Sequence, residues 1–180
     1  MLSIGKMTAG REDYYVAGLS SGDDEYYLDP IETPGRWTGA GSYMLGLDGP
    51  VEAGGFRAVL AGLNPETGMA LVANAGRPGR VTGFDLTFSA PKSVSLLWAL
   101  SDPETARMVA EAHDRAVGDA LYALEREAVA ARRGHGGVAQ VRGQGLVAAG
   151  FGHRTSRAGD PQLHTHLLTE LLGRNPQVRA

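Results

Sequence analysis

The strand-like segments at the carboxyl-terminal end of the chain constrain the fold most strongly. Residues 138–142, 146–153 and 163–172 have strand character, and only short turns with Gly or Asp-Pro separate them. Connections this short cannot cross over between parallel strands, so they favour antiparallel hairpins or a meander. Residues 80–89 alternate between apolar and polar side chains, as a half-buried strand does. We therefore expect a central antiparallel sheet.

Helical patterns surround these strands. Residues 11–20 and 51–61 have helical apolar spacing, Pro91 suits the first turn of a further helix, and Asp102-Pro103 begins a long helix predicted to run to about Arg133. Residues 1–7 could form a short strand. Residues 21–41 and 64–79 are rich in turn formers and are predicted to be mostly loop. The predicted fold class is α+β, one domain over residues 1–180 with a central antiparallel sheet flanked by helices.

Composition excludes some chemistry and leaves other chemistry open. The chain has 180 residues and no cysteine, so any bound metal must be held by His, Asp or Glu. No apolar run approaches the ~20 residues of a membrane-spanning helix, and the amino terminus lacks the apolar stretch of a signal peptide. The sequence thus predicts a cytoplasmic protein without membrane insertion.

The charge is unevenly distributed. The net charge of −3 argues against a nucleic-acid partner, but residues 1–76 carry −6 and residues 77–180 carry +3. Residues 131–157 contain no acid and five arginines: Arg132, Arg133, Arg142, Arg154 and Arg157. Such a stretch could meet several backbone phosphates, and it could equally be a solvated face.

Three histidines predict a metal site. His164 and His166 have the spacing that places two side chains on one face of a strand, and a hairpin would bring His153 beside them. The alternative is that all three are ordinary polar residues on a sheet face. Three imidazoles suit Zn, Mn, Ni or Co, and Mg less well, although cellular supply can decide which ion binds. We expect one divalent ion (Mg, Mn, Zn or Ni). His113, placed on an exposed helix face, and His135 are predicted to be structural or idle.

Asp85 and two tyrosine pairs are further candidates. Asp85 is polar in an apolar strand, where it could accept the second ring N–H of a metal-bound histidine, take a proton from a nucleophile, or simply cap a turn or pair with an arginine.

Four of the six tyrosines lie within residues 14–27 as two adjacent pairs. A phenol can act as a nucleophile if a metal or base stabilises the phenolate, but packing in the core is the more ordinary explanation of such pairs.

Two long motifs carry a family resemblance. Residues 83–95 read GFDLTFSAPKSVS, and residues 153–157 and 160–166 read HRTSR and DPQLHTH. Together with the tyrosine pairs and residues 112–114 and 134–137, they resemble the TrwC-type (MobF) conjugative relaxases over nearly the whole chain.

The resemblance implies an HUH-class enzyme with a Rep-like palm, in which a tyrosine attacks single-stranded DNA at an origin of transfer. The product would be a 5′-phosphotyrosyl enzyme, and other relaxosome proteins would be partners. Carried over by motif, the nucleophiles are Tyr14 and Tyr26, with Tyr15 and Tyr27 as the alternatives within each pair. The metal ligands are His153, His164 and His166, Asp85 is the base or histidine orienter, and Lys92, Arg154 and Arg157 are candidate DNA-backbone contacts.

The chain also departs from the family pattern. Family members continue through further strands and a helicase region, whereas this sequence contains no Gly-x-x-x-x-Gly-Lys-Ser/Thr phosphate loop. The sequence therefore predicts a relaxase domain that is incomplete at its carboxyl-terminal end, without the helicase. Two other functions remain open: a three-histidine hydrolase with a water nucleophile, and a non-catalytic module that binds single-stranded DNA.

Overall fold

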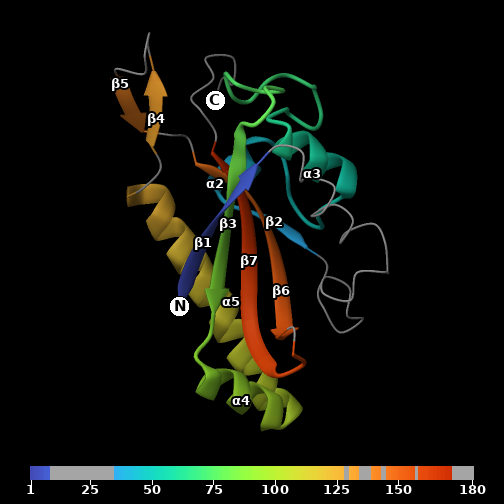
Figure 1. Cartoon of the computed structure of the whole chain (residues 1–180). Coiled ribbons are helices and arrows are strands. Elements are labelled where there is room, and N and C mark those ends of the chain that lie inside the picture. The colour runs from blue at the N-terminus through green and yellow to red at the C-terminus, as the bar shows by residue number, and fades with distance from the viewer. Residues whose placement is uncertain (9–34, 128–129, 134–138, 143–144, 157, 172–180) are drawn as a thin grey trace.

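The structure, a computed structural model, describes residues 1–8, 35–127, 130–133, 139–142, 145–156 and 158–171. Its centre is a five-stranded antiparallel sheet with the strand order β1-β3-β7-β6-β2 (Figure 1). The strands are β1 (Leu2–Thr8), β2 (Arg36–Thr38), β3 (Val81–Ser89), β6 (Leu146–Thr155) and β7 (Pro161–Leu171). The predicted α+β class and antiparallel sheet are confirmed, as are the strands expected at residues 1–7, 80–89, 146–153 and 163–172.

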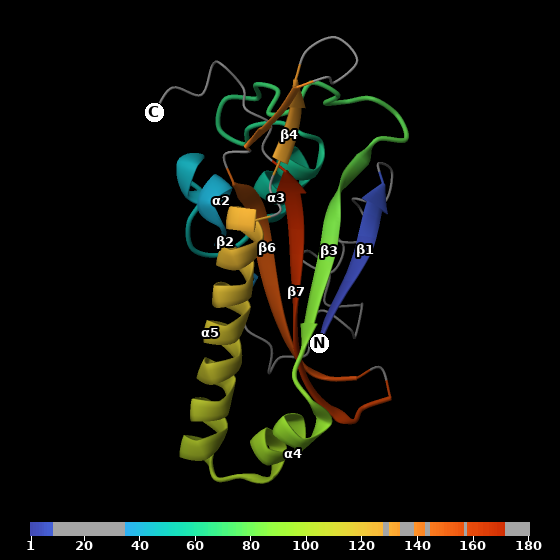
Figure 2. The ribbon, with the colours of Figure 1, turned by 90° about the vertical axis from the view of Figure 1, so that its left-hand side faces the viewer.

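The long helix α5 (Pro103–Glu127) covers one face of the sheet. α4 (Lys92–Leu100) leads into it from the end of the sheet, and Figure 2 shows α5 lying along this face. Val117 and Leu121 of α5 pack against Leu86 of β3, Leu167 of β7 and other apolar side chains of the sheet. Asp102 caps the helix as predicted, since its Oδ1 accepts hydrogen bonds from the backbone N–H groups of residues 104 and 105, both at 3.0 Å.

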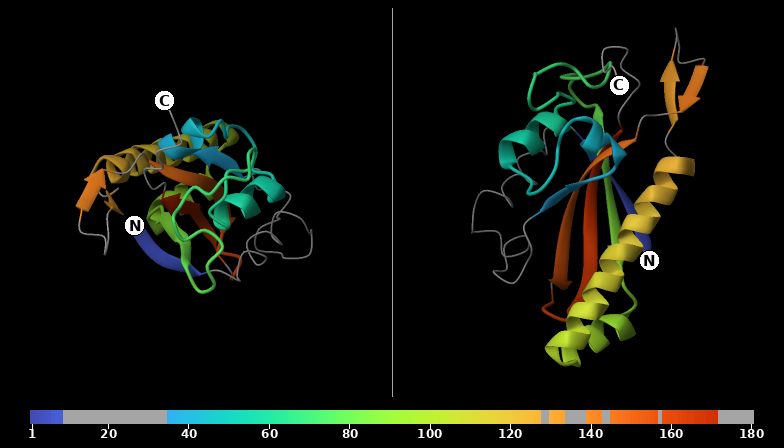
Figure 3. Two further views of the ribbon diagram at one scale, coloured as in Figure 1. Left: turned by 90° about the horizontal axis from the view of Figure 1, so that it is seen from above. Right: turned by 180° about the vertical axis from the view of Figure 1, so that it is seen from behind.

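α5 ends earlier than predicted. The sequence predicts a helix to about Arg133, but residues 130–133 form a strand, β4 (Ala130–Arg133), paired with β5 (Ala139–Arg142). Oε1 of Glu125, in the last turn of α5, accepts hydrogen bonds from the backbone N–H of Ala40 at 2.8 Å and of Leu146 at 2.9 Å, and these bonds tie the helix end to both segments. Pairing with a second strand then overrides the helical propensity of the following residues. The β4–β5 ribbon stands apart from the main sheet (Figure 3).

The opposite face is covered by α3 (Ala53–Leu60), whose formation was predicted. Phe56 and Leu60 pack against Ala149, Phe151 and other buried side chains of this face. The short strand β2 lies within residues 21–41, where the sequence predicts mostly loop, and α2 (Ala40–Met44) begins at the end of that range. The local sequence does not predict β2, because this strand is held by its pairing with β6, more than a hundred residues further along the chain.

A buried ion pair joins the segment before β3 to β7. Nη1 of Arg80 lies 3.3 Å from Oε1 of Glu170, and both side chains are almost fully buried. Burial raises the pKa of Glu170 to about 7, although the guanidinium of Arg80 opposes that rise. In the described part of the chain, no helix has the length and apolar character needed to span a membrane.

Candidate metal centre

The β6–β7 hairpin brings the three predicted histidines together. His153 pairs directly with His164, and His166 follows two residues later on the same face of β7. The centroid of the His153 ring lies 5.1 Å from that of His164 and 5.3 Å from that of His166, and 5.3 Å separates the last two rings. The residues are only 2%, 4% and 9% exposed, so solvent is largely excluded from this cluster.

The ring spacing fits one small cation. A metal about 2.1 Å from a ring nitrogen lies roughly 3.2 Å from the ring centroid, so rings at tetrahedral angles have centroids roughly 5.3 Å apart. Within the described residues, no group of three or more His, Cys, Asp or Glu side chains has the arrangement of a formed metal site. The terminal torsion of histidine is soft, so each ring can turn a nitrogen toward a cation without any movement of the backbone.

Hydrogen bonds orient two of the rings. Nδ1 of His164 lies 2.9 Å from the carbonyl oxygen of Gln162, which can only accept, so this nitrogen carries the proton. Nδ1 of His166 lies 2.9 and 3.0 Å from the two carboxylate oxygens of Asp85. In both rings Nε2 is then the nitrogen available as a ligand, the arrangement usual for metal-bound histidine.

Asp85 stands where an orienting residue is needed. It projects from β3 on the histidine face, beside β7, and the hydroxyl of Thr87 donates to its Oδ1 at 3.3 Å. The Thr87 hydroxyl also lies 3.2 Å from Nδ1 of His166. The contact between Asp85 and His166 supports the histidine-orienting alternative over a turn cap or an arginine pair.

Two of the candidate DNA contacts lie at the histidine end of the sheet. Nζ of Lys92, at the start of α4, donates to the carbonyl oxygen of Pro161 at 3.1 Å. The guanidinium of Arg154 lies 5.7 Å from the ring centroid of Trp98 in α4. Both side chains therefore join α4 to the β6–β7 hairpin.

The predicted nucleophiles, Tyr14 and Tyr26 with their neighbours Tyr15 and Tyr27, lie outside the described residues, as do Arg157 and the helix expected at residues 11–20.

The predicted exposed position of His113 is wrong. It is half-buried rather than on an exposed helix face, and its Nε2 lies 3.1 Å from the hydroxyl of Thr165, between the two histidines of β7. Burial lowers the pKa of His113, so the ring is neutral near pH 7. His113 precedes Val117 by four residues and Leu121 by eight, and this helical spacing predicts that its side chain faces the core.

Comparison with known proteins identifies the family. The family model described as TrwC relaxase matches residues 8–170. The chain belongs to the TrwC relaxase family. Its relatives include two multifunctional conjugation proteins TraI, one from Escherichia coli and one from Escherichia coli strain K12. Each is 36% identical, over 166 and 164 residues, which are 92% and 91% of this chain but 8% of each TraI protein.

Solved relaxases share the fold. A metal-free structure of the conjugative relaxase TrwC in complex with oriT DNA superposes with a TM-score of 0.74 at 36% identity, and a metal-bound complex with 0.73 at 38%. A TrwC complex with a 27-mer DNA comprising the recognition hairpin and the cleavage site gives 0.71 at 37%. Each match covers 94% of this chain and 55–56% of the solved chain, so this relaxase sequence spans just over half of the solved relatives.

Proposed function

We propose that this TrwC-family chain nicks and rejoins single-stranded DNA at an origin of transfer, using tyrosine as the nucleophile and one divalent ion at the three histidines. The observation that carries the proposal is the buried cluster of His153, His164 and His166, with His166 held by Asp85. The metal-bound and oriT-bound TrwC structures support the choice of cofactor and substrate.

The histidines and Asp85 prepare the site. Nε2 of His164 and of His166 would hold the cation, while the carboxylate of Asp85 keeps the proton of His166 on Nδ1 and fixes the ring. A divalent ion held there would supply positive charge to polarise the phosphate. Three imidazoles accept several divalent ions, so Mg, Mn, Zn and Ni are the candidates.

The tyrosines would carry out the chemistry. The phenol of Tyr14 loses its proton and attacks phosphorus; the new bond joins the tyrosine oxygen to the 5′-phosphate, and the bond to the 3′ oxygen breaks. The leaving 3′ oxygen takes up a proton and becomes a hydroxyl. Because the phosphotyrosine keeps the energy of the phosphodiester, the 3′-hydroxyl can reseal the strand without ATP. Tyr26 would serve as the second nucleophile.

Basic residues would hold the DNA. We propose Lys92, Arg154 and Arg157 as contacts to the strand backbone at the histidine end of the sheet. The β4–β5 ribbon carries Arg132, Arg133 and Arg142 in its sequence. A two-stranded ribbon can enter a DNA major groove, so this element suits a duplex hairpin next to the nick site. Other relaxosome proteins would assemble on the same DNA.

An adduct assay tests the proposal. The chain is incubated with single-stranded oriT oligonucleotides and Mn, and an SDS-resistant protein–DNA adduct is expected. Tyr14→Phe should remove most of it, whereas Tyr15→Phe, the matched control from the same pair, should leave it. Cleavage without adduct would favour the water-nucleophile hydrolase. Binding without cleavage under Mn, Mg, Ni or Zn, by a well-folded protein, would favour the non-catalytic DNA-binding module.

A further inference from the structure

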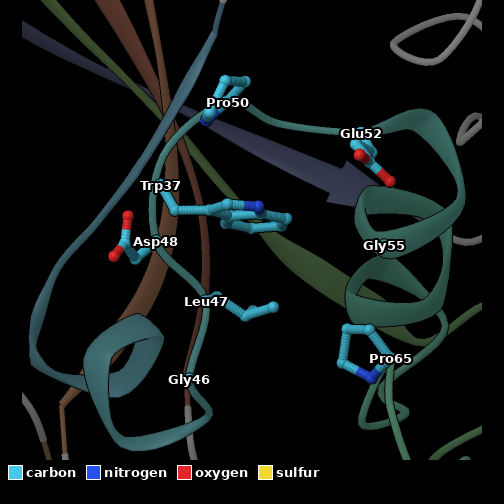
Figure 4. A pocket seen from close by; sticks show the side chains of 8 residues that line it. All are labelled: Trp37, Gly46, Leu47, Asp48, Pro50, Glu52, Gly55 and Pro65. Atoms are coloured by element: carbon cyan, nitrogen blue, oxygen red, sulfur yellow. The ribbon is translucent and has the colours of Figure 1, made fainter.

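A second concave site lies on the edge of the sheet, away from the histidines. A pocket of about 320 Å³ opens between the segment 46–50 and the start of α3, and the side chain of Trp37 from β2 stands in its wall (Figure 4). Asp48, Pro50, Glu52, Gly55 and Pro65 are among the other residues that line it. This volume is at the small end of the range for ligand sites, so it suits a single ring system rather than a large molecule.

The pocket has the shape of a slot with one aromatic wall. The indole of Trp37 is held by its packing against Phe56, with ring centroids 6.4 Å apart, and by a hydrogen bond of 3.0 Å from its backbone N–H to the carbonyl of Gly49. Gly55 leaves the slot open: a Cβ added there would lie 3.8 Å from Cζ2 of Trp37 and 3.9 Å from Cβ of Pro65. A flat ligand can therefore lie against the indole.

Glu52 places a hydrogen-bond acceptor at the α3 side of the pocket, whereas the carboxylate of Asp48 points away from the indole of Trp37 (Figure 4). None of the described residues that line the pocket is a lysine or arginine, and no hydrogen bond or ion pair among the described residues uses the carboxylate of Glu52. A carboxylate in this position favours ligand groups that offer N–H donors. An amino-bearing nucleobase combines a π-face for Trp37 with N–H groups for a carboxylate, as in the known pairing of Asp or Glu with the amino group of cytosine.

The pocket lies within reach of a strand bound at the histidines. Trp37 pairs with Ala149, so its side chain is on the same face of the sheet as His153, four residues further along β6. Four residues of strand span roughly 13 Å. That is about four nucleotides at the 3.4 Å spacing of a stacked strand, and fewer if the strand is extended.

We propose that this pocket takes up one amino-bearing base (cytosine, adenine or guanine) of the single strand a few nucleotides from the scissile phosphate. The inference rests on the proposed function, and it adds a determinant of sequence preference. Trp37 stacks on the base, and Glu52 selects for exocyclic amino groups over thymine. Gly55 keeps the slot open.

Abasic scanning tests the inference. Oligonucleotides that form the adduct are prepared with one abasic site at each of the positions flanking the nick, and binding is measured by fluorescence anisotropy. One position should weaken binding about 10-fold, in line with the loss of a stacked base. In Gly55→Leu, which fills the slot, that penalty should disappear. Gly54→Leu is the matched control, since a Cβ at Gly54 meets nothing within 4 Å, and it should behave as the unmodified chain does.

The role of Glu52 is tested by changing the base at the position that the abasic scan identifies. The unmodified chain should prefer an amino-bearing base over thymine about 5-fold or more, and Glu52→Gln should remove most of that preference. An adduct that forms normally, with no abasic position sensitive to Gly55→Leu, would overturn the inference and leave the proposed function standing. Quenching of Trp37 fluorescence by arginine amide, but by no nucleoside, would also overturn it in favour of a protein partner. Absence of any adduct would instead count against the proposed function.

Discussion

Replacing Asp85 by Asn should weaken metal binding at the histidines without unfolding the protein. The carboxylate of Asp85 accepts the Nδ1 proton of His166 at 2.9 and 3.0 Å, and the two side chains are only 20% and 11% exposed, so water screens the contact little. Asn keeps the size of the side chain but removes the charge. Asn also carries an amide NH2 group, and if this group faces the Nδ1–H of His166, the two donors cannot form a hydrogen bond.

The expected loss follows from the strength of that contact. A charge-assisted hydrogen bond is roughly twice as strong as a neutral one, and outer partners of metal-bound histidines typically contribute 10- to 100-fold in metal affinity. We therefore expect the Kd of the chain for Mn, Ni or Zn to rise by about 10- to 100-fold in Asp85→Asn. This corresponds to about 1.4–2.7 kcal/mol.

Calorimetric titration at pH 7.5 provides the measurement, with circular dichroism to show that the variant is folded. Asp160→Asn is the matched control, because Asp160 is an exposed carboxylate in the turn between β6 and β7, and its Kd should stay within about twofold. An Asp85→Asn chain that binds metal as tightly as the control would refute the orienting role of Asp85.

Three further predictions concern stability, each measured by urea unfolding. Because burial raises the pKa of Glu170 to about 7, the folded chain binds this proton more tightly than the unfolded chain, so stability should fall by roughly 3 kcal/mol as pH rises from 4.5 through 7. Glu170→Gln should remove this decline, and an identical pH dependence in both proteins would contradict it. Gly83→Ala should cost at least about 2 kcal/mol, because the new Cβ would lie 1.9 Å from a backbone oxygen of β7, whereas Gly152→Ala, with nothing within 4 Å, should be close to neutral. A double-mutant cycle of His113→Ala and Thr165→Val should give a coupling of about 0.5–1.5 kcal/mol, and additive effects would show that their 3.1 Å contact contributes nothing.

The sequence alone determined the fold class and the histidine cluster. Both depend on local patterns: alternation in β3 and the spacing of His164 and His166 fix which side chains share a face, and short turns require antiparallel strands. The hairpin between His153 and His164 follows from the same rules. The family resemblance then supplied a chemical role for residues whose spacing alone indicated only a probable metal site.

Other features depend on contacts between residues that are far apart in the sequence, and only the tertiary structure shows them. Asp85 could have oriented a histidine or capped a turn, and only the pairing of β3 with β7 places it against Nδ1 of His166. The end of α5 before β4, and the existence of β2, likewise follow from strand pairing that local propensity does not encode. The three-histidine cluster that the sequence predicts thus gains a carboxylate partner that only the fold could assign, because a contact between residues 81 positions apart leaves no periodic signal in the chain.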